Sequence, residues 1–315
     1  MKLFKVIYHL KSPVASEWQA DTIFGHLCWA KSYLDGESKL LDFLTEYGHD
    51  DPPLIVSNGF PGDLLPKPIT APITVAEHGT IKEQIERFKN SKKQKETILL
   101  TPKQFEEAIH GKEFVASAQD KHLPWKRVVS KNVISRNTGT TGDEGNLYDF
   151  EETVWSRIED KSVIDIPVSI YVKVRDDFDS KAERLFAFIA EQGYGKRKSV
   201  GYGHIGSWSF KPFPGFNSPT VPNGFVTLSN YSPAQGDPQK GYWQAIVKYG
   251  KLGESFAAQG NPFKKPLLMF AAGSTFYDSP CKEYYGRIVK NVAHPPYGKV
   301  VQYALAFPVA MKISE

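Results

Sequence analysis

A glycine-rich loop with a run of basic residues is the segment of this chain whose composition most directly suggests chemistry. Residues 191–206 read EQGYGKRKSVGYGHIG, with five glycines around the uninterrupted KRKS at 196–199. Glycine lets backbone amides approach an anion closely, and lysine and arginine neutralise phosphate charge. Tyr194 and Tyr202 alternate with the charges and offer faces on which bases can stack. The loop therefore predicts a binding site for a phosphate-bearing polymer.

The glycine pattern does not predict a mononucleotide or dinucleotide site. Residues 201–206, GYGHIG, match G-x-G-x-x-G literally, but that fingerprint must follow a strand and open a helix. Here a predicted helix precedes the glycines, and SWSFKPFPG, which is unsuited to a helix, follows them. GYGKRKS also lacks the spacing of a P-loop. We exclude both motifs.

A second basic segment strengthens the prediction. Residues 120–136 carry a net charge of +4 and residues 193–205 carry +3, whereas the whole chain carries only +4. The rest of the chain is therefore net negative, and two concentrated basic segments favour an anionic polymer as partner. Trp125, followed by Lys126 and Arg127, is a candidate for stacking on a base, with core packing as the alternative. The alternative interpretation is that the glycines only end the preceding helix and that the basic residues are solvated. One glycine is enough to end a helix, whereas this loop has five.

The chain predicts an α+β protein with antiparallel sheets. Strands are expected at 2–12, 164–176 and 204–210, and helices at 20–34, 38–48, 101–111 and 179–193, with Thr101 and Gln104 as a capping box. Residues 126–155 are expected to form a hairpin arm with a polar tip. The charged residues 81–96 fit a solvated helix face. Gly- and Pro-rich residues 211–224 suggest a boundary between a unit at 1–212 and a smaller β-rich unit at 222–315.

Composition excludes several classes of protein. Hydrophobic residues make up 41% and charged residues 23% of the 315 positions, as in ordinary globular proteins. No apolar run approaches the roughly 18 residues of a membrane helix, and the first residues do not fit a signal peptide. Cys28 and Cys281 match no metal spacing and fit reduced thiols of a cytoplasmic protein. We expect no metal, no cofactor and no membrane partner.

Five segments in order make the chain similar to a known family. They read ADTIFGHLCWA, LIVSNGFPGDLLPKP, KNVISRNTGTTGDEGNLYDF, GYGKRKSVGYG, and AAGSTFYDSP with YYGRIVKNV. A glycine-rich loop directly after the second helix of a ferredoxin-like unit resembles the RAMP superfamily of CRISPR-associated proteins. Within it, the order of these segments resembles the fourth Csm subunit of type III-A effector complexes, over nearly the whole chain.

This resemblance implies a fold, a function and partners. The fold would be two ferredoxin-like (RRM-like) units, with a β-hairpin thumb at about 126–155 and an inserted helical segment at about 75–112. The function would be antiviral defence, as an RNA-binding subunit that caps the complex and binds the 5′ handle of crRNA. The protein partners would be the large polymerase-like (cyclase) subunit and the Csm backbone RAMP subunit.

The resemblance also implies contact residues in three regions. The expected RNA contacts on the thumb are Lys131, Asn132, Arg136 and Thr138. Those on the loop are Gly195, Lys196, Arg197, Lys198, Ser199, Gly201, Tyr202 and Gly203. Those at the first helix are Thr22, Phe24 and Gly25.

Two alternatives to a non-catalytic RNA-binding subunit remain. Some RAMP relatives cleave RNA without metal by acid–base chemistry, and His26 and His204 are the histidines near the expected groove. A lone histidine with no visible partner is weak support, so a metal-independent endoribonuclease that processes repeat RNA is the second hypothesis. A scaffold that contacts only protein is the third.

Overall fold

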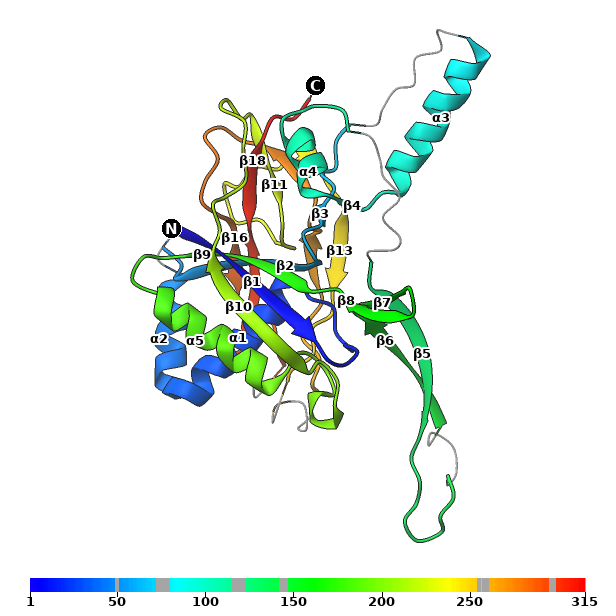
Figure 1. Cartoon of the computed structure of the whole chain (residues 1–315). Coiled ribbons are helices and arrows are strands. Elements are labelled where there is room, and N and C mark those ends of the chain that lie inside the picture. The colour runs from blue at the N-terminus through cyan, green and yellow to red at the C-terminus, as the bar shows by residue number, and fades with distance from the viewer. Residues whose placement is uncertain are drawn as a thin grey trace.

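The structure, a computed structural model, describes residues 1–48, 51–71, 80–114, 123–141, 147–253, 256, 261–294 and 299–314. Figure 1 shows a body of two packed halves from which two elements stand out. One is helix α3 (Ile81–Glu96), and the other is the ribbon of strands β5 (Trp125–Asn132) and β6 (Leu147–Val154). We call this ribbon, with the described residues 133–141 at its tip, the arm.

A four-stranded antiparallel sheet forms the centre of the first half. Its strands lie in the order β10 (Ile205–Pro212), β1 (Lys2–Leu10), β9 (Val168–Val174) and β2 (Leu54–Pro61). Alternate residues of β1, such as Val6 and Tyr8, are buried on one face, as the sequence pattern predicts. Tyr8 pairs with Trp208 on one side and Val168 on the other, which fixes the register.

Three helices cover one face of this sheet. They are α1 (Ala20–Asp35), α2 (Glu37–Glu46) and α5 (Asp179–Gln192), and Figure 1 shows them side by side. Their apolar residues, including Ile23, Phe43 and Phe186, are buried with the sheet in one core. Helix α5 ends at Gly193, as predicted, because this residue adopts a φ of +79° that favours glycine.

The strand predicted through residues 164–176 is divided. The structure has β8 (Ser162–Asp165), paired with β7 (Ser156–Glu159), and then β9 in the central sheet. Pro167 lies between them and has no N–H to donate to a ladder. The unbroken apolar alternation therefore spans two different sheets.

The second half is built from strands. A sheet in the order β12-β15-β11-β18 is accompanied by the ribbons β13/β14 and β16/β17. The bounds are β11 (Gly224–Thr227), β12 (Gly241–Tyr242), β13 (Ala245–Lys248), β14 (Leu267–Phe270), β15 (Thr275–Tyr277), β16 (Tyr285–Val289), β17 (Gln302–Ala306) and β18 (Pro308–Met311). Residues 205–253, 261–294 and 299–314 contain no α-helix. The described residues of this second half thus lack the α-helices that a second ferredoxin-like unit would need.

The two halves share their hydrophobic cores. Tyr303 and Leu305 of β17 are buried among the residues of the first sheet and its helices, and the Tyr303 hydroxyl accepts a hydrogen bond from the Val56 N–H at 3.0 Å. Ile55 and Tyr171, on the opposite face of that sheet, pack against the second half. The central sheet is therefore covered on both faces.

Short elements connect these parts. Strands β3 (Leu65–Pro66) and β4 (Leu99–Leu100) pair beside helix α4 (Pro102–Ile109). The predicted capping box of α4 is confirmed, since the Thr101 hydroxyl accepts from the Gln104 N–H and the Gln104 side chain accepts from the Thr101 N–H. The prediction of a mixed α/β chain with antiparallel sheets is confirmed. None of the helices among the described residues is both long and apolar enough to span a membrane.

Candidate nucleic-acid interface

The base of the glycine-rich loop, residues 193–195 with 202–203, is fixed by a buried tyrosine. The Tyr194 ring stacks on Trp18, with ring centroids 3.5 Å apart, and its hydroxyl donates to the Glu17 carbonyl at 2.8 Å. The N–H of Tyr194 donates to the Gly203 carbonyl at 2.9 Å, which closes the loop at its neck. Tyr194 is therefore a structural residue with no face left for a base.

Glycine is required at the neck by close approach. A Cβ at Gly203 would lie 1.9 Å from the Tyr194 carbonyl oxygen, and one at Gly195 would lie 2.8 Å from the Ser16 Cβ. Both residues also have positive φ, at +63° and +83°. The sequence pattern predicted freedom of the backbone, and the structure uses that freedom to pack the loop tightly.

The amide groups of the loop are engaged within the protein. Gly195 donates its N–H to His26 Nε2 at 3.0 Å, Lys196 to Ser16 Oγ at 3.0 Å, and Gly203 to the Pro13 carbonyl at 2.9 Å. Gly201 donates to the Lys198 carbonyl at 3.2 Å. The expected use of glycine amides as phosphate ligands is therefore not supported, and phosphate contacts would fall to side chains.

The crown of the loop, residues 196–201, presents those side chains. Arg197 adopts the left-handed conformation, with φ at +62°, and a 3₁₀ turn η2 (Lys198–Val200) follows it. Lys196 and Ser199 are exposed, whereas Arg197 and Lys198 are half-buried. Of the three consecutive cations, Lys196 therefore faces solvent, whereas Arg197 and Lys198 lie partly against the protein.

Arg197 joins the loop to the arm. Its guanidinium lies 4.3 Å from the centre of the Phe150 ring and 5.1 Å from that of Tyr148, and donates to the Tyr148 hydroxyl at 2.9 Å. From the arm, Lys131 Nζ lies 4.4 Å from the centre of the Tyr202 ring. These cation–π contacts bring the two basic segments, which are far apart in sequence, into one surface.

The lower part of the arm is partly neutralised by its partner strand. Lys126 pairs with the Glu151 carboxylate at 3.0 Å, and Arg127 pairs with Glu152 at 2.6 Å. The Glu152 side chain is only 3% exposed. Burial raises the pKa of its carboxyl, but hydrogen bonds from Tyr202 and Arg127 outweigh burial and hold the pKa below the usual range. Lys126 and Arg127 are thus already paired with acids.

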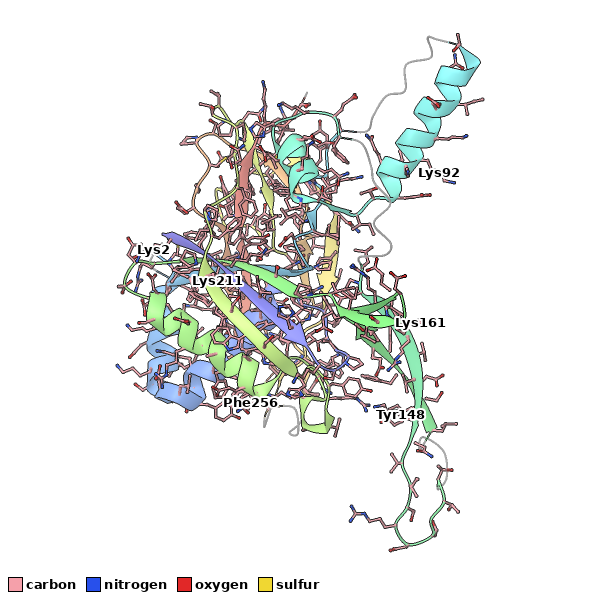
Figure 2. All side chains as sticks on the ribbon, in the orientation of Figure 1. Lys2, Lys92, Tyr148, Lys161, Lys211 and Phe256 are labelled. Atoms are coloured by element: carbon pink, nitrogen blue, oxygen red, sulfur yellow. The ribbon has the colours of Figure 1, made fainter. Side chains whose placement is uncertain are left out.

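The outer part of the arm extends away from the body, and its side chains are open to solvent (Figure 2). Asn132, Arg136 and Thr138 are exposed on the described residues of the arm, and Trp125 at its base is 47% exposed. The Trp125 indole donates its N–H to the Ser156 carbonyl at 3.1 Å and leaves ring surface accessible. Of the two roles considered for Trp125, the structure is compatible with stacking and excludes full core packing.

The first helix does not supply the expected aromatic contact. Phe24 is only 2% exposed and stacks on Tyr303, with ring centroids 4.6 Å apart. Gly25 meets no other atom within 4 Å of an added Cβ, so no close approach explains a glycine there. Thr22 is half-buried and hydrogen-bonds with the Tyr194 side chain. We therefore assign Phe24 to the core, a correction that follows from its position facing the sheet.

His26 is held as a neutral acceptor. Burial, with a smaller effect from the nearby Lys198 charge, lowers the pKa of its imidazole to about 3. Its Nε2 already accepts the Gly195 N–H. His204 is exposed, and its N–H donates to Ser12 Oγ at 2.8 Å. Within the described part of the chain, no group of three His, Cys, Asp or Glu side chains is placed to hold a metal.

Sequence reasoning missed the aromatic side of the arm. Tyr148 and Phe150, two residues apart on β6, face the loop together, and Glu152 continues the same row. The alternation YDFEE carried this signal, because every second residue of a strand lies on one face. The sequence did not tell which face would meet the loop.

Known proteins share both sequence and fold with this chain. It is 26% identical over 311 residues to "CRISPR system Cms protein Csm4" of Thermococcus onnurineus (strain NA1), with 97% of this chain and 95% of that protein covered. No protein-family model matches. The fold is similar to a chain of the crystal structure of a Csm1-Csm4 cassette in complex with AMPPNP, at a TM-score of 0.65, 19% identity and 99% coverage of both chains. It is also similar to a chain of the crystal structure of the Csm3-Csm4 subcomplex in the type III-A CRISPR-Cas interference complex. That similarity has a TM-score of 0.56, with 14% sequence identity and 100% coverage of both chains.

Proposed function

We propose that this chain is a Csm4-type subunit of a type III-A CRISPR effector complex and that it anchors the 5′ handle of crRNA without catalysing a reaction. The observation that carries the proposal is the direct contact between arm and loop through Arg197, Lys131 and their aromatic partners. Had the two basic segments lain on opposite sides of the molecule, they could not hold one RNA backbone.

Side chains do the binding in this proposal. Lys196 and Ser199 on the crown and Arg136 on the arm are exposed. An extended RNA strand between them would meet cations from both segments, with Trp125 as a stacking face at the base of the arm. Arg197 and Lys131 would act mainly by holding arm and loop together.

We further propose that the first half is a ferredoxin-like unit and the arm its thumb. Two crossover helices, α1 and α5, each connect strands of the sheet, and the order β10-β1-β9-β2 places the first and third strands of the unit in the centre. This order supports the proposal. The loop then follows the second helix of the unit, directly before its last strand.

The protein partners are proposed from the relatives. A relative is named in a cassette with Csm1, and another in a subcomplex with Csm3. We propose that this chain likewise bridges a large polymerase-like subunit and a backbone subunit in the cytoplasm. Exposed apolar side chains, Ile158 and Val163 on β7/β8 and Val247 and Leu268 on β13/β14, supply two separate surfaces for such contacts.

A non-catalytic role is favoured over cleavage. A general base must be able to take a proton near neutral pH, whereas the half-buried His26 imidazole has its pKa lowered to about 3 and its Nε2 occupied. Of the two histidines considered for catalysis, His204 remains for the endoribonuclease hypothesis. Incubation of the full chain with repeat RNA in EDTA decides: site-specific cutting that His204→Ala abolishes would establish the enzyme.

The salt dependence of RNA binding tests the proposed interface. We expect the double variant Lys196→Ala/Arg136→Ala to bind 5′-handle RNA more weakly. The slope of log K against log salt should fall by about 1.4, since each phosphate contact to a single strand contributes about 0.7. Lys93→Ala/Lys95→Ala, which removes two exposed cations from α3, is the matched control and should leave the slope unchanged. Equal slopes for both pairs would contradict the interface.

A further inference from the structure

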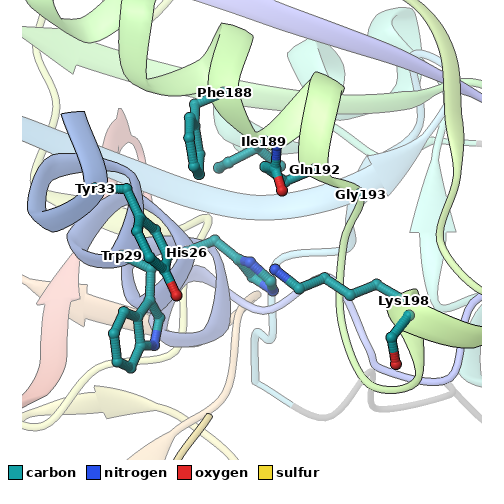
Figure 3. A pocket seen from close by; sticks show the side chains of 9 residues that line it. His26, Trp29, Tyr33, Phe188, Ile189, Gln192, Gly193 and Lys198 are labelled. Atoms are coloured by element: carbon teal, nitrogen blue, oxygen red, sulfur yellow. The ribbon is translucent and has the colours of Figure 1, made fainter. Parts of the chain in front are cut away.

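A pocket lies between helices α1 and α5 on the side of the loop away from the arm. Its volume is about 420 Å³, within the range of about 300–1,000 Å³ typical of small-ligand sites. Figure 3 shows its walls: His26, Trp29 and Tyr33 come from α1, Phe188 and Gln192 from α5, and Lys198 from the loop. Ser199 of the crown also lines this pocket, but the aromatic side chains of the pocket have no role in the interface proposed above.

Three aromatic rings line the pocket in succession. Trp29 and Tyr33 have ring centroids 5.8 Å apart at 29°, and Tyr33 and Phe188 have centroids 5.9 Å apart at 23°. Tyr33 is 58% exposed, although burying a ring of this size would be favourable. Such a row of nearly parallel, accessible rings suits a flat ligand that stacks.

The polar groups of the pocket complete this pattern. Lys198 reaches across its mouth toward His26 (Figure 3), so a positive charge stands at one end of the aromatic row. Gln192 is exposed and brings a carboxamide, which can both donate to and accept from the edge of a base. A flat ring joined to an anionic group, which is the chemistry of a nucleotide, matches both features.

The pocket is continuous with the proposed interface. Arg197 contacts the arm, and the next residue, Lys198, lines the pocket, as do Gly193 and Ser199. An RNA strand that extends from the arm across the crown, past Arg197 and then Lys198, would reach the mouth of the pocket. An apolar side chain of a protein partner would use the rings but not the charge of Lys198, so RNA is the better match.

We propose that this pocket receives one unstacked base of the bound RNA, which stacks on Tyr33 and Phe188 while Lys198 contacts the adjoining phosphate. This inference rests on the proposed function, because the arm and the loop must first hold the strand. The pocket would make RNA binding depend on the presence of a base at this one nucleotide. Gln192 would contact the edge of that base.

The test pairs protein variants with abasic RNAs. Tyr33→Leu in the full chain should bind 5′-handle RNA about 5- to 150-fold more weakly, the range given by base–aromatic stacking of about 1–3 kcal/mol, with an unchanged salt slope. One abasic substitution in the RNA should weaken wild-type binding equally and add nothing in Tyr33→Leu. Tyr249→Leu, at a tyrosine of comparable exposure outside the pocket, is the control and should bind like wild type.

The outcomes separate the two proposals. Wild-type affinity in Tyr33→Leu, or additive effects at every abasic position, would overturn the pocket while the salt slopes still support arm and loop. Loss of a protein partner in Tyr33→Leu with intact RNA binding would also overturn it, in favour of a protein contact. Unchanged salt slopes in Lys196→Ala/Arg136→Ala would instead overturn the proposed function itself. Because Tyr33 is exposed, thermal unfolding near the wild-type temperature should verify that Tyr33→Leu folds.

Discussion

The base and the crown of the glycine-rich loop follow each other in sequence but are stabilised differently. At the base, Tyr194 and Gly203 are buried and their backbones meet in a hydrogen bond at 2.9 Å. At the crown, Lys196 and Ser199 are exposed. The difference shows that one glycine-rich, basic motif can hold two functions: residues that build the loop and residues available to a ligand. Substitutions along the loop should therefore separate stability from binding.

The largest expected effect lies at the neck. In Gly203→Ala the new Cβ would meet the Tyr194 carbonyl oxygen at 1.9 Å in a left-handed backbone, so we expect a loss of about 3 kcal/mol or more in the free energy of unfolding. Gly201→Ala, whose Cβ meets nothing within 4 Å but whose φ is +93°, should lose only about 1–2 kcal/mol. Urea unfolding of both variants measures the contrast. Similar losses would contradict the distinction between neck and crown.

The next effect depends on pH. The folded protein holds the His26 pKa near 3, against about 6.5 when unfolded, so the unfolded state binds the additional proton between these values. Stability is therefore fully present above pH 6.5 and falls as the pH drops toward 3, by at most about 1.4 kcal/mol per pH unit from this residue. In His26→Gln, whose amide oxygen can still accept the Gly195 N–H, this part of the slope should vanish. Parallel stability curves for wild type and variant from pH 6.5 to 4 would refute it.

A smaller effect is expected where crown and arm meet. Arg197→Ala removes the guanidinium from Phe150 and Tyr148, and we expect the free energy of unfolding to fall by about 1–2 kcal/mol. Arg197→Ala keeps the Cβ and therefore leaves the left-handed strain of this position in place, whereas Arg197→Gly relieves it. Hydrogen exchange of β5 and β6 should rise in both variants. Unaltered exchange would mean that the arm is held without Arg197.

The smallest effect on folding should come from the exposed crown. Lys196→Ala should change the free energy of unfolding by less than about 0.5 kcal/mol, because its side chain is exposed and its backbone contact to Ser16 is kept. Its RNA salt slope should nevertheless fall by about 0.7. A stability loss comparable with that of Gly203→Ala would remove the contrast between base and crown.

Sequence periodicity predicted the elements that depend on local chemistry. The end of α5 at Gly193 and the capping box at Thr101 follow from preferences of single residues within a few positions. The division of the strand at Pro167 was missed, because alternation alone does not say which sheet a strand joins. Phe24 was expected at the RNA contact because of the resemblance alone, and its packing against Tyr303 of β17 places it in the core instead.

What the sequence by itself determined is the chemistry available: glycines, cations and tyrosines in one short segment, with a second basic segment upstream. Only the tertiary structure decided how that chemistry is divided. It buried Tyr194, engaged the glycine amides inside the protein, and brought Arg197 against the arm. The physical reason is that a hydrogen bond or a ring contact between residues tens of positions apart depends on how sheets and helices pack, which no local pattern contains.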